Sequence, residues 1–475
     1  MRVLTLSALG LLLAAGLAAQ DKWSLERCIQ FALENNIQIQ QARISEQASR
    51  YMHTQAVADF LPSVNADAGY GVHMGRSIDP TTYDFVNQTI QTHSVSLNSG
   101  VTLFNGLRKI NILRSSKYDL LSSEYASKDV ADNVALNVTR LYLQILLSHE
   151  ELKKATERLA IAVQQLDQTR KLFDAGTITE GNVLDVKAQL AADSLGLVIA
   201  RNALELSKLN LALLLEVENP DLFEVETPEI DIVPPQVLAE KDAEGIYLIA
   251  EQNQPALQSA RYALQGSQYR WAAARGLYYP SLSFFYTLRT TYSSIGKRTV
   301  GYTTVTDTLT GTLNGVPFSL PLDLGISLPV MEDATFWQQY HDNFSQSLGL
   351  SLNIPLFNGL QVRTNVRNAK LNFIRAKYNL KNLQNQLRNE VHVAYTDAKA
   401  AYQKYLAAEN SARALEKSFE YVTRKFNTGA ATMLEYSTAG AALSAAQSEM
   451  LKAKYEYIFK LKVLDYYAGN PITLN

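Results

Sequence analysis

The sequence predicts an α+β fold built by duplication, with two long helical hairpins and four β-strands in one chain. Three observations predict it: short motifs recur at constant offsets, four segments alternate apolar with polar residues, and two long stretches contain no proline. The 475 residues are 47% hydrophobic and 19% charged, which is the composition of a folded chain. Wholesale disorder is therefore excluded.

Charge and cysteine content exclude two further classes. A net charge of −2 does not supply the concentrated basic face of a nucleic-acid-binding protein, so we expect no nucleic-acid partner. The single cysteine, Cys28, excludes a disulfide framework and a cysteine-rich metal cluster. No small residues precede Cys28 as they would at a lipid-attachment site, and we interpret it as a core residue of a helix.

Residues 1–20 predict a signal peptide. Arg2 gives a positive start, residues 4–17 are almost uninterruptedly apolar, and small residues follow near the expected cut at 18–20. A membrane anchor is the alternative, but the apolar stretch is short for a bilayer span. No later stretch reaches the roughly 18 consecutive apolar residues of a membrane helix. The chain is expected to be exported and to lack a transmembrane helix.

An internal repeat organises the rest of the chain. The motif Leu-Phe-Asn-Gly-Leu at 103–107 recurs at 356–360, and the turn motif that begins at Phe173 recurs at the same offset of 253. A Pro-Ser pair at Pro62 recurs at Pro280 with an offset of 218. The second half therefore carries 35 extra residues after Pro280.

The repeat sets the predicted domain boundaries. Residues 21–215 form the first repeat, with a helix, two strands and a long helical hairpin, and residues 243–475 form the second. Residues 216–242 read as a linker, because the acidic residues of 216–235 lack basic partners and four prolines interrupt any regular element there. We interpret it as a solvated linker, and a partner-binding acidic tract is the alternative.

Four segments predict strands, because apolar and polar residues alternate in each. They are residues 64–74, 94–103, 282–289 and 347–356. Each is about ten residues long, enough for a tilted strand to cross a bilayer. Their polar faces are rich in Ser, Gly and Asn, which suits a water-filled lumen. A soluble sandwich is the alternative, but four strands cannot close a sheet, so a barrel needs several chains.

The two proline-free stretches, 107–172 and 360–425, predict helices about 100 Å long. Apolar residues recur in them at spacings of three and four, as in a coiled coil. In the first repeat a large side chain, Leu159, precedes a small one, Ala162, and at the equivalent positions of the second repeat the small Ala412 precedes the large Leu415. This exchange of sizes predicts that the two seams interdigitate. Beyond each turn the seam continues, and we interpret its residues as core rather than as a cofactor site.

Taken together, the chain resembles the TolC-type outer-membrane efflux and export channels, from Trp23 to about Tyr467. The resemblance rests on the duplicated order of elements, the two Leu-Phe-Asn-Gly steps, the steps at Pro62 and Pro280, and turns of the form Gly-x-x-Thr. It implies a membrane protein that is a homotrimer, with four strands from each of three chains in one 12-stranded barrel. A tunnel of helices would continue the barrel through the periplasm, with residues 216–242 around its middle.

The resemblance also implies two sites at the turns between the long helices. Contacts with a periplasmic adaptor would be made by Gly176, Thr177, Thr179, Gly429, Ala430, Ala431 and Thr432. A periplasmic gate would involve Asn182, Asp185 and Glu435. The family often places an acid where this chain has Asn182 and Thr438. If the second hairpin forms the acidic constriction, as the resemblance implies, Glu435 alone remains of its acidic pair. The alternative role for Asp185 and Glu435 is that of acids favoured at a helix N-terminus.

The extra residues fall in a loop at 293–345 that is rich in Thr, Gly, Pro and aromatic residues. Its position between the third and fourth strands places it outside the cell in the implied barrel. Two roles remain open for this loop, a lid over the pore and a surface decoration.

The motifs of an enzyme are missing. The six histidines show no metal-ligand spacing, and neither a nucleophile-elbow nor a P-loop pattern occurs. We expect no catalytic, cofactor or metal site. The resemblance implies a passive exit duct of a tripartite efflux or type I secretion system, in contact with outer-membrane lipid in a Gram-negative bacterium and opened by an adaptor and an inner-membrane pump. A stand-alone outer-membrane pore and a periplasmic coiled-coil scaffold are the alternatives, and the sequence does not identify the cargo.

Overall fold

The computed structural model describes residues 22–78, 83–87, 89–228, 230, 232, 234, 242–470 and 473. The expected signal peptide lies outside these residues, as do 229, 231, 233 and 235–241 of the expected linker. The chain divides into two compact units. The helical unit comprises Met1–Met52, Ser116–Ser267 and Asn372–Asn475, and the strand unit comprises His53–Ser115 and Gln268–Leu371.

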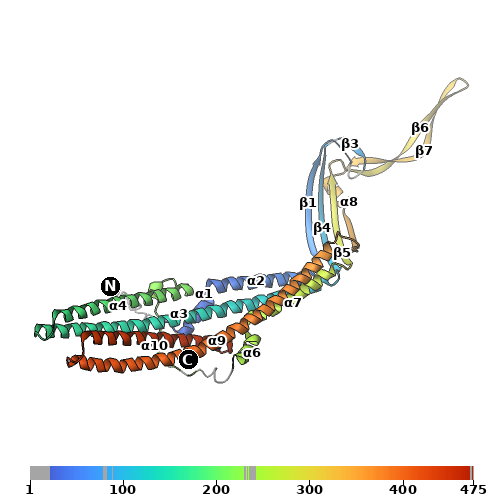
Figure 1. Ribbon diagram of the computed structural model, residues 1–475. Coiled ribbons are helices and arrows are strands. Elements are labelled where there is room, and N and C mark those ends of the chain that lie inside the picture. The colour runs from blue at the N-terminus through green and yellow to red at the C-terminus, as the bar shows by residue number, and fades with distance from the viewer. Residues whose placement is uncertain are drawn as a thin grey trace, which may run out of the picture. The chain divides into compact units, whose positions relative to one another are not determined.

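The strand unit is built on one antiparallel sheet of four strands in the order β1-β4-β5-β8 (Figure 1). These strands are β1 (Ser63–His73), β4 (Ile90–Phe104), β5 (Ser281–Ser293) and β8 (Ser345–Asn353). They coincide with the four predicted segments, and the first repeat supplies β1 and β4 while the second supplies β5 and β8. The pairing of β4 with β5 therefore joins the two repeats, and β1 and β8 are left at the edges.

The register gives the sheet two unlike faces. Cross-strand pairs such as Ala66 with Leu97, Leu97 with Leu288, and Phe284 with Leu350 place apolar side chains on one face. Pairs such as Asn65 with Asn98, Asn98 with Thr287, and Thr287 with Ser347 place polar side chains on the other. Large apolar side chains on the first face are exposed, with 61–70% of the Leu348, Leu350 and Leu352 side chains accessible. An apolar face of this kind is suited to lipid.

The segment predicted as a loop at 293–345 contains regular structure, and in this respect the prediction is wrong. Strands β6 (Lys297–Leu313) and β7 (Val316–Asp333) pair as a two-stranded ribbon, followed by the short helix α8 (Phe336–Asp342). Asn314 and Gly315, both with positive φ, form the two-residue turn between Leu313 and Val316. Asn-Gly is the favoured sequence for such a hairpin turn, so the signal was present in the sequence.

Two further short strands, β2 (Arg76–Ile78) and β3 (Phe85–Asn87), pair between β1 and β4. Four strands were predicted for the chain. In addition to the four-stranded sheet, the described residues contain the pair of β2 with β3 and the pair of β6 with β7. The short strands β2 and β3 offered too few residues for the alternation to be recognised.

One buried side chain, Gln339 of α8, holds the two ends of the β6–β7 ribbon together. It is 4% exposed. Its Oε1 atom accepts from the Ser293 amide at 2.9 Å, and its Nε2 atom donates to the carbonyls of Ser293 and Ala334, each at 2.9 Å. The Ala334 amide donates in turn to the carbonyl of Gly296 at 2.9 Å. The chain thus enters and leaves the ribbon at one fixed point beside the end of β5.

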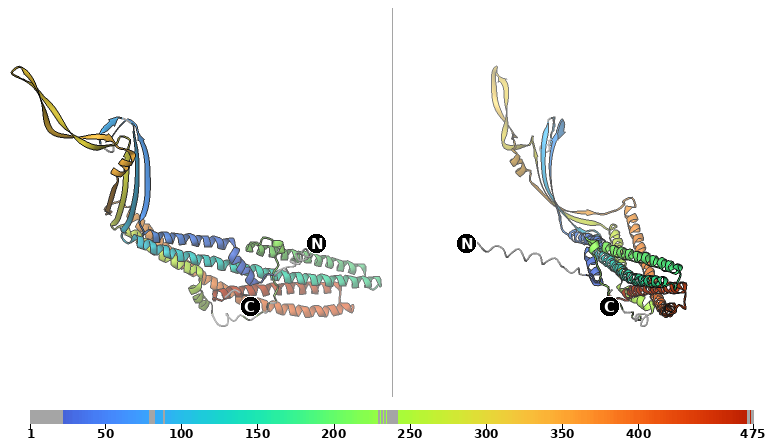
Figure 2. Two further views of the ribbon diagram at one scale, coloured as in Figure 1. Left: turned by 180° about the vertical axis from the view of Figure 1, so that it is seen from behind. Right: turned by 90° about the vertical axis from the view of Figure 1, so that its left-hand side faces the viewer.

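The helical unit contains two long antiparallel hairpins that run side by side (Figure 2). Helices α3 and α4 form the first and α9 and α10 the second, and helices α3 and α9 also contribute residues to the strand unit. The bounds are α3 (Arg108–Asp174), α4 (Glu180–Leu215), α9 (Gln361–Asn427) and α10 (Met433–Tyr467). The shorter elements are α1 (Leu25–Asn35), α2 (Ile37–Ala58), the 3-10 helix η1 (Pro220–Leu222), α6 (Ala243–Asn253) and α7 (Pro255–Gly276).

The predicted seams form the core of the hairpins. Ala162 is 2% exposed and Ala412 is 5% exposed, each facing inward from its own long helix. Near the turns, Leu166, Val186 and Tyr436 belong to one buried cluster that draws on both hairpins. The seams are therefore buried as predicted, although Phe173, the last seam residue of α3, lies exposed. The interdigitation of Leu159-Ala162 with Ala412-Leu415 stays a prediction. Among the described residues, no helix carries a stretch long and apolar enough to span a membrane.

The described first part of the expected linker packs against the start of the chain instead of being wholly solvated. Phe223 and Val225 are each 3% exposed. The Trp23 amide donates to the Glu224 carbonyl at 2.9 Å, and the Glu226 amide donates to the Trp23 carbonyl at 3.0 Å. The Tyr142 hydroxyl of α3 donates to the Glu226 carbonyl at 2.8 Å. Burial of the two apolar side chains outweighs the acidic composition on which the prediction was based.

The Leu-Phe-Asn-Gly-Leu motif turns a strand into a long helix. Gly106 and Leu107 both have positive φ, 66° and 63°, as do Gly359 and Leu360 in the second repeat, at 60° and 65°. The Asn105 side chain accepts from the Lys109 amide at 3.2 Å, close to the start of α3. Left-handed backbone is readily adopted by glycine, which explains why the motif occurs with glycine in both halves.

Gly106 has a second reason to be glycine, which Gly359 does not share. A Cβ atom at Gly106 would lie 2.5 Å from the carbonyl oxygen of Gly276 and 2.7 Å from the Tyr279 Cβ atom. A Cβ atom at Gly359 would have no such neighbour within 4 Å. The strand–helix junction of the first repeat is therefore packed directly against the end of α7.

We expect Gly106→Ala to destabilise the protein by about 1–2 kcal/mol for the left-handed backbone and by about 1–3 kcal/mol for overpacking. Gly176→Ala is the matched control, because Gly176 has a similar φ of 75° and nothing within 4 Å. Thermal unfolding followed by circular dichroism should give a clearly lower Tm for Gly106→Ala than for the control. Equal Tm values would show that the approach to Gly276 does not constrain the junction.

Candidate functional site: the helical turns and the groove behind them

The turn between α3 and α4 is a compact, exposed loop closed by its own backbone. Gly176 has φ 75°, and its amide donates to the Phe173 carbonyl at 2.8 Å. The Thr177 amide and hydroxyl both donate to the Leu172 carbonyl, at 3.0 and 2.7 Å. These bonds satisfy carbonyls that the end of a helix leaves free. The turn is therefore ordered without any contact from outside.

The turn between α9 and α10 repeats this geometry. Gly429 has φ 77°, its amide donates to the Phe426 carbonyl at 3.0 Å, and the Ala430 amide donates to the Lys425 carbonyl at 2.8 Å. Gly429 and Ala430 are exposed, and Ala431 is half-buried. Both turns thus present small side chains and backbone at the ends of their hairpins, a surface on which another helix can pack closely.

The helices that leave the two turns begin differently. At α10, Thr432 and Glu435 form a capping box: the Glu435 amide donates to Thr432 Oγ1 at 3.2 Å, and the Thr432 amide donates to Glu435 Oε2 at 2.7 Å. At α4, the Thr179 hydroxyl donates to Asn182 Oδ1 at 2.7 Å, and its side chain makes no capping bond to the helix. The start of α10 is therefore the better-capped of the two.

The expected gate residues occupy separate surroundings. Glu435 is exposed, and the two hydrogen bonds that it accepts from the Thr432 amide and hydroxyl hold the pKa of its carboxyl below the ordinary value of 4.5. Asp185 is exposed one turn into α4, and Asn182 is half-buried against Thr179. The bonds of Glu435 are those of a helix cap, which is the alternative role considered for it from the sequence.

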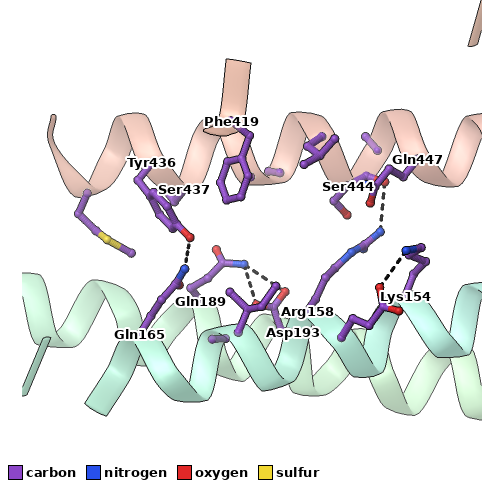
Figure 3. A pocket seen from close by; sticks show the side chains of 18 residues that line it. Lys154, Arg158, Gln165, Gln189, Asp193, Phe419, Tyr436, Ser437, Ser444 and Gln447 are labelled. Atoms are coloured by element: carbon purple, nitrogen blue, oxygen red, sulfur yellow. Dashed lines mark hydrogen bonds and ion pairs between the residues drawn. The ribbon is translucent and has the colours of Figure 1, made fainter. Parts of the chain in front are cut away.

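Sequence reasoning missed a groove that lies behind the turns, between the two hairpins (Figure 3). It encloses about 380 Å³ and is lined from α3 and α4 on one side and from α9 and α10 on the other. Each hairpin supplies polar side chains that point into it, including Arg158, Gln165 and Asp193 from the first hairpin and Tyr436 from the second. No motif marks it, because its lining is set by which faces of the hairpins meet.

Two hydrogen bonds cross this groove. The Arg158 guanidinium of α3 donates to the Ser444 carbonyl of α10 at 3.2 Å. The Gln165 side-chain amide of α3 donates to the hydroxyl of Tyr436. Burial lowers the pKa of Arg158, opposed by the charges of Asp193 and Glu151. Together the two bonds tie the first hairpin to α10 near the turns.

Metal-binding geometry is not found in the part of the chain that the structure describes, where no three His, Cys, Asp or Glu side chains are grouped to hold an ion. Titratable groups with shifted pKa values are instead dispersed through the helix packing. The arrangement therefore offers surfaces and a groove for contact.

Comparison with known proteins gives one family. The family model described as outer membrane efflux protein matches residues 28–216 and 246–470, which is most of the chain. The alkaline protease secretion protein AprF of Pseudomonas aeruginosa is 23% identical over 456 residues, covering 92% of this chain and 82% of AprF. The outer membrane protein TolC of Escherichia coli is 21% identical, covering 90% of this chain and 80% of TolC.

Solved structures share the fold. The outer membrane protein VceC from Vibrio cholerae superposes with a TM-score of 0.73 at 15% identity, covering 94% of this chain and 96% of VceC. At this level of identity the likeness concerns the fold alone. It includes both repeats, since nearly the whole of each chain is matched.

We expect Glu435→Ala to speed amide hydrogen exchange at the start of α10, because the Thr432 amide loses its acceptor. Glu435→Gln should keep most of the protection, since a glutamine side chain still accepts in a capping box. Hydrogen-exchange mass spectrometry of peptides that cover 429–440, corrected for intrinsic rates, measures the effect.

The same protection should depend on pH. The folded-state pKa of Glu435 is lowered, so its contribution is complete above 4.5 and is lost as the pH falls through the folded value. Equal exchange in Glu435→Ala and the unmodified protein would show that the capping box does not hold this end of the helix.

Proposed function

The chain belongs to the outer membrane efflux protein family, and we propose that it is the outer-membrane exit duct of a tripartite efflux or type I secretion system. One observation carries the proposal: a single chain combines a sheet with one apolar and one polar face and two long helical hairpins. The sheet suits passage through a membrane, and the hairpins suit a tunnel beyond it.

The edges of the sheet support a homotrimer. In lipid, the free backbone groups of β1 and β8 need partners, because no water is present to bond them. Pairing of β8 of one copy with β1 of the next satisfies both edges, and three copies of the four-stranded sheet make 12 strands. The apolar face with Leu348, Leu350 and Leu352 then contacts lipid, and the polar face lines the lumen.

The proposed location is the outer membrane of a Gram-negative bacterium, with the helical unit in the periplasm. Relatives that are named as outer membrane proteins support it, and the expected signal peptide at 1–20 is consistent with export. The name of AprF refers to secretion of an alkaline protease. For this chain the cargo class stays open between small toxic compounds and an exported polypeptide.

The turns at Gly176 and Gly429 are the proposed docking surface for a periplasmic adaptor, which couples the duct to an inner-membrane pump. Their exposed small residues favour close packing with another helix, and both turns are ordered beforehand by their own hydrogen bonds. Asn182, Asp185 and Glu435 lie immediately beyond these turns and are the proposed gate. Docking energy supplied there acts directly on the ends of the hairpins.

In-cell photo-crosslinking tests the adaptor contact. A photoreactive residue at Thr179 or Ala431 should capture a periplasmic adaptor. One at Asn385, which is exposed on α9 far from the turn, should not. Mass spectrometry of the crosslinked band identifies the partner, and its cognate pump narrows the cargo. Capture of no adaptor by a trimer correctly placed in the outer membrane would favour a stand-alone pore instead. A chain found only in the periplasm would favour the scaffold.

Opening of the duct is proposed to separate the hairpins and to break the two bonds across the groove. Tyr436→Phe and Arg158→Ala should each raise the conductance of trimers in a planar bilayer. Loss of about 1 kcal/mol, the typical value of one hydrogen bond, shifts a closed–open balance about five-fold. Lys154→Ala is the control, since Lys154 lines the same groove but pairs with Glu157 of its own helix at 2.8 Å. Conductance raised equally by the control would disprove the tether.

A further inference from the structure

Among the described residues, the polar face of the sheet carries one exposed large apolar side chain, Phe285 of β5; Ile90, on the same face, is fully buried. Its neighbours along the strand on that face are Ser283 and Thr287. The cross-strand partners on either side are Gly100 of β4 and Gly349 of β8. Sequence reasoning overlooked Phe285, because it breaks the alternation by following the outward-facing Phe284. An aromatic ring on a face of Ser, Asn, Thr and Gly therefore needs an explanation.

The ring of Phe285 lies over Gly349. A Cβ atom built at Gly349 would be 2.7 Å from Phe285 Cζ and 3.0 Å from its Cε1 atom, so a side chain at Gly349 would displace the ring. Covering a glycine with a cross-strand aromatic ring is a known way to stabilise a sheet. In that role, one side of the Phe285 ring contacts Gly349. The side chain of Phe285 nevertheless remains 39% exposed, so part of the ring is still accessible.

A cavity of about 530 Å³ opens at this place within the strand unit. Besides Phe285, its lining includes the hydroxyl-bearing residues Thr102, Ser283 and Ser351. Lys109 and Asp59 also line it, and the Lys109 ammonium donates to the Asp59 carbonyl. The side chains of Lys109 and Asp59 carry opposite charges, so the lining has no distinguishing net charge. The lining also includes Phe284 of the opposite face, and Phe285 is the aromatic residue that the cavity shares with the polar face.

We propose that Phe285 is a stacking site for aromatic groups of solutes that pass along the polar face of the sheet. The proposal rests on the proposed function, in which this face lines the lumen and three copies of the ring lie at one level. An aromatic solute stacks on the accessible side of the ring, while Gly349 and Gly100 leave room for the flat arrangement. The interaction is weak enough for release, which a duct requires.

Single-channel recording in planar bilayers tests the site with two cations of equal charge and heavy-atom number. Benzyltrimethylammonium has an aromatic ring, and (cyclohexylmethyl)trimethylammonium is its saturated counterpart. Added on the side of the strand unit, the aromatic cation should block current at about three- to ten-fold lower concentration, as expected for an aromatic pair. Phe285→Ser and Phe285→Leu should both remove this preference, and Phe285→Leu preserves apolar cover of Gly349 should the serine variant fail to fold. Ser347→Ala is the control and should keep the preference, because Ser347 is exposed on the same polar face but does not line the cavity.

A second variant tests the seating of the ring. Gly349→Ala should change the block by the aromatic cation, because the added methyl group forces the Phe285 ring from its position. The double variant Phe285→Ser/Gly349→Ala should behave as Phe285→Ser alone, since no ring remains to be displaced. If the preference persists in both Phe285 variants, or if the unmodified trimer conducts but shows no preference, the stacking site is disproved. If the unmodified trimer does not conduct at all, the proposed duct fails instead.

Discussion

The unpaired edges of one four-stranded sheet constrain the rest of this molecule. Among the strands that the structure describes, β1 and β8 each have a row of backbone donors and acceptors that pairs with no other strand. Next to an apolar face that suits lipid, such groups can be satisfied only by another strand. In the proposed trimer each copy must therefore offer two complementary edges, and its helices must leave the sheet in directions compatible with its neighbours. The turn from strand into helix uses left-handed backbone at both Gly106 and Gly359.

The two repeats share the same backbone conformations at their turns, but the residues around these turns differ. Both Leu-Phe-Asn-Gly-Leu turns use consecutive left-handed residues, and both helical turns place a left-handed glycine after the long helix. Yet Gly106 is packed against Gly276 while Gly359 faces open space within the chain. Likewise, Thr432 caps its helix with Glu435, and Thr179 bonds to Asn182 instead. The backbone of the repeat has been kept, and the contacts made by it have diverged.

Much of the fold could be predicted because period-two and heptad patterns are local properties of the sequence. The four strands of the sheet, the long helices and the buried positions near Ala162 follow from such patterns. The groove crossed by Arg158 and Gln165 could not be predicted, because it depends on which faces of distant helices meet. Phe285 was missed because two successive phenylalanines obscure which one points outward. The ribbon was missed for another reason: its many threonines and prolines suggested a loop, although Asn314-Gly315 marks a hairpin.

The buried Gln339 has a consequence for how this surface can change over time. It fixes Ser293 and Ala334 at one point, so that the ribbon of β6 and β7 begins and ends beside the same place. Residues beyond that closure take no part in the register of β5 with β8. Insertions, deletions and substitutions in the ribbon can therefore accumulate without altering the sheet. In the proposed barrel this segment would lie outside the cell, where its sequence can diversify while the register of the sheet is inherited unchanged.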